Sequence, residues 1–133
     1  SPCIHSILAN KIGNYDKAYE FYLRTARLDL NDINNDTCDG CHITSMAGTW
    51  MTISKGFAGI RIKDGKLYLA PNIPQNWKSI GFNIRFRDNY LRISINKESL
   101  TIENIEGPQL SLYCRDKHVH VDANQSKSIM YEN

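Results

Sequence analysis

The chain has 133 residues, of which 41% are hydrophobic and 23% are charged, and its formal net charge is +2. This size allows one medium domain, or a small domain with a helical attachment. Interleaved acidic and basic residues argue against the basic stripe of a nucleic-acid-binding protein, and no apolar run approaches the roughly 18 residues of a membrane span. We therefore expect a cytoplasmic protein that binds neither nucleic acids nor membranes.

The first 58 residues have helical apolar spacing. Apolar residues at every fourth position from Ile4 predict a first helix that stops at Gly13, a good helix-ending residue. The spacing predicts a second helix over residues 15–30 and a third over residues 43–57. We expect the apolar stripes of these helices to form core. The stripes consist of Ile4, Leu8, Ile12, Ala18, Phe21, Tyr22, Thr25, Leu28, Ile43, Met46, Trp50, Ile53 and Phe57.

After residue 60, apolar and polar residues alternate, which predicts β-strands. The pair Asp64-Gly65 between two such segments predicts a hairpin. Short antiparallel strands separated by turn residues are typical of a β-sandwich. His118, His120 and Asp122 also alternate, and we interpret them as a solvated strand face rather than as metal ligands. The further predicted strands span residues 80–87, 90–96, 100–105 and 110–114.

Four cysteines stand at positions 3, 38, 41 and 114. Only Cys38 and Cys41 are close in sequence, and neither a second pair nor a histidine at ligand spacing completes a zinc site. A redox dithiol would follow a strand, and none precedes this pair. We expect free, reduced cysteines and no metal.

The segment from Asn34 to Trp50 places turn residues, His42, Thr44 and Ser45 ahead of an apolar helical run. The first turn of a helix presents unpaired N–H groups and a positive dipole end, which can hold an anion or a sugar hydroxyl. An ordinary capped helix start explains the same residues. The spacing alone favours the ordinary helix start, because capping signals are common and anion-binding loops are not.

A series of short motifs also runs along the first 95 residues. The motifs are Ser1–Ala9, Gly13, Ala18-Tyr19, Thr25–Leu30, Asn35-Asp36-Thr37, Asp39-Gly40, His42-Ile43, Ala47–Trp50, Gly56-Phe57, Gly59, Pro71–Pro74 and Trp77. In this order they resemble the C-terminal part of glycoside hydrolase family 65, the group of maltose, trehalose and kojibiose phosphorylases.

The resemblance implies an α+β architecture. The last helices of a catalytic (α/α)6 barrel, residues 1–58, would precede an antiparallel, jelly-roll-like β-sandwich, residues 59–133. The first and third helices would run parallel, so that their starts near Ser1 and His42 open on the barrel end that holds the active site. The helices would also expose apolar surfaces that meet the remainder of the barrel, and we expect a homo-oligomer.

The resemblance further implies phosphorolysis of an α-glucoside. Inorganic phosphate, a co-substrate rather than a cofactor, would attack the anomeric carbon of a disaccharide with inversion, while a carboxylic acid protonates the leaving oxygen. The family's acid lies upstream of this sequence, so that no catalytic residue is expected here. The expected phosphate- and substrate-binding residues are His42, Thr44, Ser45, Gly40, Gly48, Ser1 and His5.

Other functions fit the same residues. The protein could be a hydrolase of the same family, which uses water in place of phosphate. The sandwich could be a carbohydrate-binding module with Trp77, Tyr68 or Tyr90 as a sugar platform, although such aromatic residues are more often packed between strands. A purely structural sandwich that caps the barrel is the third possibility.

Overall fold

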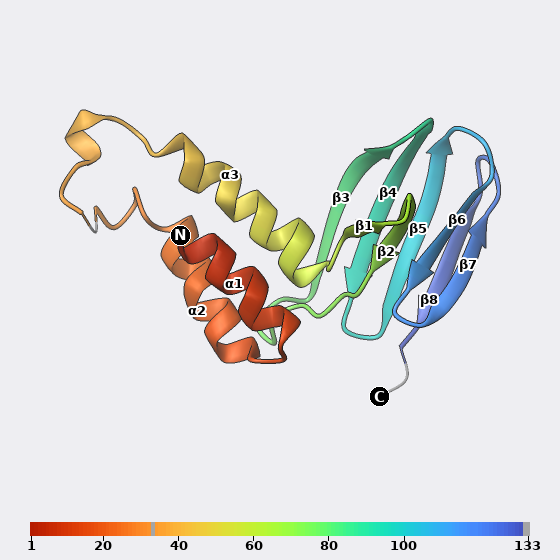
Figure 1. Ribbon diagram of the computed structural model, residues 1–133, viewed down its shortest axis with the longest axis horizontal. Coiled ribbons are helices and arrows are strands. Elements are labelled where there is room, and N and C mark those ends of the chain that lie inside the picture. Colours follow the sequence, from red (N-terminus) through yellow and green to blue (C-terminus); the bar gives the residue numbers. More distant parts are fainter. Residues whose placement is uncertain (33, 132–133) are drawn as a thin grey trace. The chain divides into compact units, whose positions relative to one another are not determined.

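The computed structural model describes residues 1–32 and 34–131. It divides into two units, Ser1–Phe57 and Ala58–Asn133, whereas the sequence predicts a boundary one residue later. Helices make up the first unit and strands the second (Figure 1). This arrangement confirms the predicted α+β class.

Three α-helices form the described part of the first unit: α1 (Pro2–Lys11), α2 (Tyr15–Ala26) and α3 (Ile43–Met51). A short 3-10 turn, η1 (Thr37–Asp39), precedes α3, and a π-helical segment, η2 (Thr52–Phe57), continues it. Helix α2 begins where the side chain of Asn14 accepts a hydrogen bond from the Lys17 N–H at 3.3 Å, a usual N-cap.

Helix α2 ends at Ala26, so the prediction that it reaches residue 30 is wrong. The helical ladder tightens at its end, where the Leu28 N–H donates to the Thr25 carbonyl. Asp29 then directs its carboxylate to His42 across the following loop. The contact between Asp29 and His42 therefore takes the place of the last helical turn, residues 27–30, that the apolar spacing predicted.

The predicted third helix also changes character part-way. It is an α-helix to Met51 and a π-helix from Thr52 to Phe57. The hydroxyl of Thr52 donates to the Gly48 carbonyl, and that of Ser54 donates to the Trp50 carbonyl, each at 2.9 Å. Such bonds from hydroxyl side chains to the preceding turn loosen and bend helices, which explains the local change in winding.

Helices α1 and α3 pack closely through small residues. A Cβ atom added to Gly48 would lie 3.1 Å from both Cβ and Sγ of Cys3, and one added to Gly56 would lie 3.7 Å from Cγ1 of Ile7. Because these contacts advance together along both segments, α1 and α3 run in the same direction (Figure 1). Both helices therefore begin at the same end of the unit, with His42 about one turn beyond Ser1.

The apolar stripes of α1 and α3 point outward, which corrects the prediction that they form core. Ile12 is 78% exposed and Ile43 is 77% exposed, and Ile4, Leu8, Met46 and Trp50 are each about half exposed. Small side chains fill the interior of the unit instead. They include Cys3, Ser6, Ala9 and Gly48. The stripe residues Ala18, Thr25 and Phe57 are buried as predicted. The exposure confirms the expectation that the helices present apolar surface.

The second unit is a sandwich of two four-stranded sheets. All the strands predicted from the alternation are present. One further strand, β8 (Ser126–Met130), was not predicted, because Ile129 is its one buried residue. The pairs are antiparallel except β2 and β6, which pair in parallel and correct the all-antiparallel expectation. One sheet has the order β1 (Arg61–Lys63), β2 (Lys66–Leu69), β6 (Leu110–Cys114), β7 (Lys117–Val121), and the other has the order β3 (Ser79–Phe86), β4 (Asn89–Asn96), β5 (Ser99–Glu106), β8 (Ser126–Met130).

Alternating side chains of both sheets form the sandwich core. In β4, Leu91, Ile93 and Ile95 are buried, while the residues between them are exposed. Two amides are buried beside these apolar groups, Asn89 and Asn104: Asn104 donates to the Pro108 carbonyl at 2.8 Å and accepts from Asn89 at 3.1 Å. Because its hydrogen bonds are satisfied, Asn104 ties the turn after β5 to the core.

The Gly107 turn gives a direct test of the sandwich. Its φ of +112° suits glycine, and an added Cβ would lie 2.4 Å from the Asp88 carbonyl oxygen. We expect Gly107→Ala to lower the free energy of unfolding by about 2 kcal/mol or more. Urea unfolding followed through the amide NMR signals of β4 measures this change.

The matched control is Gly81→Ala in β3, where an added Cβ would meet nothing closer than 3.7 Å. This variant should unfold within about 1 kcal/mol of the wild type. Equal urea midpoints for the two variants would contradict the described geometry of the Gly107 turn.

Candidate active-site loop

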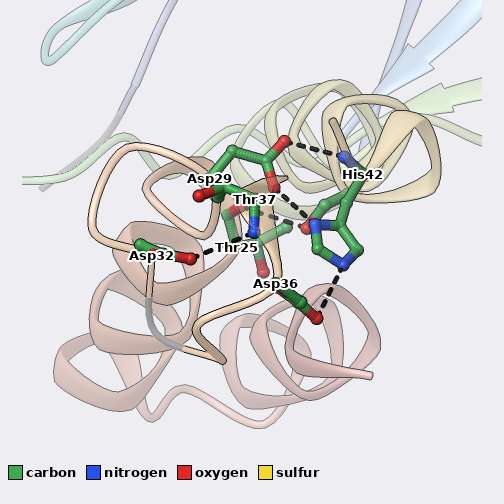
Figure 2. Close-up of polar contacts among 7 residues, drawn as sticks. Thr25, Asp29, Asp32, Asp36, Thr37 and His42 are labelled. Atoms are coloured by element: carbon green, nitrogen blue, oxygen red, sulfur yellow. Dashed lines mark hydrogen bonds and ion pairs between the residues drawn. The ribbon is translucent and has the colours of Figure 1, made fainter. Parts of the chain in front are cut away.

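His42 is the residue that caps the start of α3, and its side chain faces back toward the end of α2 (Figure 2). Asp29 binds it through both carboxylate oxygens. Oδ2 accepts the backbone N–H of His42 at 2.8 Å, and Oδ1 lies 2.5 Å from the ring Nδ1. The pair fixes both the backbone and the ring orientation of His42.

Asp36 lies on the other side of the ring. Its Oδ2 is 3.4 Å from Nε2 of His42, a longer contact than that of Asp29. The Asp36 side chain is 39% exposed, whereas that of Asp29 is 17% exposed. Nε2 is therefore the ring atom with the weaker and more accessible partner.

The two carboxylates change the protonation of this cluster. The hydrogen bond to Asp29 raises the pKa of His42 above its ordinary value of 6.5, and the charge of Asp36 acts in the same direction. The same hydrogen bond lowers the pKa of Asp29 below 3.8. Both carboxylates therefore favour the protonated form of the His42 ring.

The loop before α3 is ordered by a second aspartate. Asp32 accepts the Thr37 N–H at 3.1 Å, and this hydrogen bond lowers the pKa of the Asp32 carboxyl. Gly40 ends the η1 turn with a φ of +121°, a conformation that favours glycine. Asp29 and Asp32 together define the path of the chain toward His42.

The remaining predicted site residues fall into three places. Ser45 lies in the first turn of α3 and donates to the Thr25 carbonyl at 3.3 Å, and Thr44 beside it is exposed. Ser1 and His5 form a separate group at the start of α1, where Nδ1 of His5 lies 3.0 Å from the Ser1 carbonyl oxygen. Gly48 is buried against Cys3, one and a half turns into α3.

Sequence reasoning missed the partners of His42. Neither Asp29 nor Asp36 is among the predicted site residues, yet both contact the imidazole. Asp29 precedes His42 by 13 residues, and no helical or strand periodicity links positions at that spacing. The available signal was the occurrence of both residues in the ordered family motifs.

Other possible sites are limited in the described ranges, 1–32 and 34–131. No group of three or more His, Cys, Asp or Glu side chains there is placed to hold a metal ion. All four cysteines are free, with Cys38 and Cys41 exposed. No helix among these residues is long and apolar enough to cross a membrane.

Two of the proposed sugar-platform residues are engaged with neighbours in the sandwich. The ring of Tyr68 stacks on that of Tyr113 with centroids 4.7 Å apart. The guanidinium of Arg85 covers the Tyr90 ring at 4.7 Å. Each ring therefore has one face engaged with a neighbour in the sandwich.

Two domains of one family match the chain. Residues 1–51 match the glycosyl hydrolase family 65 central catalytic domain, and residues 60–121 match the glycosyl hydrolase family 65 C-terminal domain. The chain belongs to glycosyl hydrolase family 65. This assignment confirms the resemblance, and the match to the family's C-terminal domain agrees with the β-sandwich.

Relatives in the family have recorded activities. The chain is 39% identical over 127 residues to an α,α-trehalose phosphorylase of Thermoanaerobacter brockii and 41% identical over 112 residues to a maltose phosphorylase of Bacillus subtilis. These alignments cover 96% and 84% of this chain. The chain spans 16% and 15% of the two relatives, about a sixth of their length.

A solved structure assigned as a kojibiose phosphorylase from the human microbiome has the same fold. It superposes with a TM-score of 0.90 at 37% sequence identity. The match covers 98% of this chain and 17% of that one. The family 65 chain described here therefore corresponds to a short part of a much larger protein.

The protonation of His42 tests the loop geometry. We expect Asp29→Asn to lower the pKa of His42 toward its ordinary value of 6.5, because the main cause of the raised pKa is removed. An NMR titration of the His42 ring measures the shift. Asp39→Asn, a change in the same loop at a residue that does not contact His42, is the control. An unaltered His42 pKa in Asp29→Asn would contradict the pairing.

The same pair predicts how the stability of the helical unit depends on pH. The raised pKa of His42 gives a contribution that is complete below 6.5 and is lost as pH rises through the folded-state value. The lowered pKa of Asp29 gives one that is present above 3.8 and is lost as pH falls through its folded-state value. The stability difference between wild type and Asp29→Asn should therefore be largest between these two ordinary values.

Proposed function

We propose that this chain is the C-terminal part of an inverting α-glucoside phosphorylase, in which the His42 loop contributes to the phosphate site. The observation that carries the proposal is the His42 ring at the start of α3, which Asp29 orients and whose pKa it raises. The trehalose and maltose phosphorylases that the chain is similar to support the reaction class. The substrates would be a disaccharide and inorganic phosphate, and the products β-glucose 1-phosphate and a free sugar.

Phosphate needs hydrogen-bond donors and positive potential where it attacks the anomeric carbon. With Nδ1 bound to Asp29, the protonated His42 ring offers an N–H at Nε2, and Asp29 favours that protonated form by raising the pKa of the ring. Exposed Thr44 and the N-terminal end of α3 lie directly beside it. Ser1, at the same end of the unit, is the expected donor from α1.

The charges around His42 indicate which of its two carboxylate contacts phosphate would displace. Asp29 and Asp36 together outweigh the single positive charge of the imidazolium, so that phosphate would be repelled if both stayed in place. The Asp36 contact is long and exposed, whereas the Asp29 contact is short and bidentate. Phosphate therefore replaces Asp36 at Nε2, and Asp29 acts as a positioning residue.

The general acid and most of the sugar pocket are proposed to lie in the part of the protein that precedes this chain. The aspartates of the loop have other roles, since Asp29 binds His42 and Asp32 binds the Thr37 N–H. The exposed apolar faces of α1 and α3 would contact the remainder of the barrel. A homo-oligomeric state and a cytoplasmic location remain predictions.

Phosphate kinetics of the full-length protein test the proposal. We expect His42→Gln and Asp29→Asn each to raise the KM for phosphate about tenfold or more, since each removes or misorients a charged donor. Asp36→Asn should leave this KM unchanged or lower it, because it removes the competing carboxylate.

The pair Asp29→Asn and Asp36→Asn separates function from folding. If the cluster only stabilises the loop, both variants should lower the melting temperature and neither should change the phosphate dependence selectively. If the disaccharide is cleaved at the same rate with and without phosphate, the protein is a hydrolase and the proposed phosphorolysis is wrong.

Activity should also require the preceding part of the protein. General acid catalysis contributes on the order of 10² to 10⁴ in rate, and this chain is proposed to lack that residue. Purified residues 1–133 should release no glucose 1-phosphate from maltose, trehalose or kojibiose in a coupled assay. Turnover by these residues alone would place the catalytic acid among the carboxylates of this sequence.

A further inference from the structure

The sandwich unit contains a cleft that the proposed reaction does not use. Its volume is about 520 Å³, within the range of roughly 300 to 1,000 Å³ that small-molecule sites occupy. Asn72, Gln75 and Lys97 line it, together with Arg115 and Tyr131. A second depression shares Gln75 and Lys97 with it and continues toward Trp77 and Lys78.

Hydrogen bonds between distant segments hold the walls of the cleft together. Nζ of Lys97 donates to the Gln75 carbonyl, and Nη2 of Arg115 donates to the Pro71 carbonyl at 3.0 Å. The Arg115 guanidinium also lies 4.3 Å from the centre of the Tyr131 ring. Since these contacts join four segments of the chain, the cleft is formed before any ligand binds.

The cleft carries excess positive charge. Lys78, Lys97 and Arg115 line the two depressions, against one carboxylate, that of Glu98. Within residues 1–32 and 34–131, no ion pair joins any of these three cations to a carboxylate. Lys97 and Arg115 each use one donor on a main-chain carbonyl, which leaves further N–H groups for an anion.

The neutral part of the lining suits sugar hydroxyls. The side-chain amides of Asn72 and Gln75 can donate and accept at once, as a hydroxyl does. Trp77 adds an aromatic surface beside the lysines, and indole rings pack against the apolar faces of sugars. Amides, an indole and unneutralised cations at one place match a ligand with both hydroxyls and a phosphate.

We infer that this cleft binds a phosphorylated monosaccharide at a site separate from the His42 loop. The cations hold the phosphomonoester, and the amides and Trp77 hold the sugar ring. The inference does not rest on the proposed phosphorolysis, because the cleft lies entirely in the sandwich unit and its residues are distinct from those of the loop.

NMR titration of residues 1–133 tests the site with three probes: glucose 1-phosphate, glucose and inorganic phosphate, each up to about 10 mM, a range that reveals dissociation constants in the millimolar region. The reporters are the Trp77 indole N–H and the Asn72 side-chain amide. We expect saturable shifts with glucose 1-phosphate, at an affinity about tenfold or more above that for either other probe. Signals of the His42 loop, recorded in the same spectra, report binding at that site independently.

Lys78→Gln and Lys97→Gln should each weaken glucose 1-phosphate binding about tenfold. Lys78 is exposed, so its variant should keep the fold even if Lys97→Gln disturbs the wall. Lys63→Gln, in β1, is the matched control and should leave the affinity unchanged. Absence of saturable shifts, equal affinity for inorganic phosphate, or equal loss in Lys63→Gln and Lys78→Gln would overturn the inference.

Discussion

The contact between Asp29 and His42 is the constraint on which the candidate site depends. It joins the turn after α2 to the residue that precedes α3, and η1 is the helical turn between them in the described residues. One carboxylate oxygen holds the backbone and the other holds the ring. Because Nδ1 is fixed in this way, Nε2 is the ring atom left to meet a ligand, and the same carboxylate raises the pKa of the ring. Local order, ring orientation and charge thus arise from a single side chain.

The packing of the helical unit explains why its chemistry lies at one end. Two glycines, Gly48 against Cys3 and Gly56 against Ile7, let α1 approach α3 and η2 closely, and α1 and α3 run in the same direction. Larger apolar side chains such as Ile12 and Ile43 are left on the outside. An interior of small residues with an apolar exterior is what a unit needs if further helices cover it. The match of residues 1–51 to the central catalytic domain of family 65 agrees with this interpretation.

The sequence predicts most of the sandwich because the alternation of its strands reports burial directly, whereas the apolar stripes of α1 and α3 are exposed. Strand β4 alternates buried and exposed residues along its length, and the turn around Asp64-Gly65 matches its hairpin. Strand β8 was not predicted, because Ile129 is its one buried residue and no alternation of buried and exposed residues marks it. The parallel pairing of β2 with β6 and the early end of α2 depend on contacts between distant segments. The partners of His42 were missed for the same reason, although the residue itself was identified from the character of its loop.

A structure of the full-length protein crystallised with phosphate tests the central claim most directly. The account predicts phosphate within hydrogen-bond distance of Nε2 of His42, with Nδ1 still bound to Asp29 and with Asp36 displaced from the ring. Phosphate bound elsewhere in the barrel, with His42 still held between Asp29 and Asp36, would contradict it. The His42 loop would then be an ordinary, well-capped helix start.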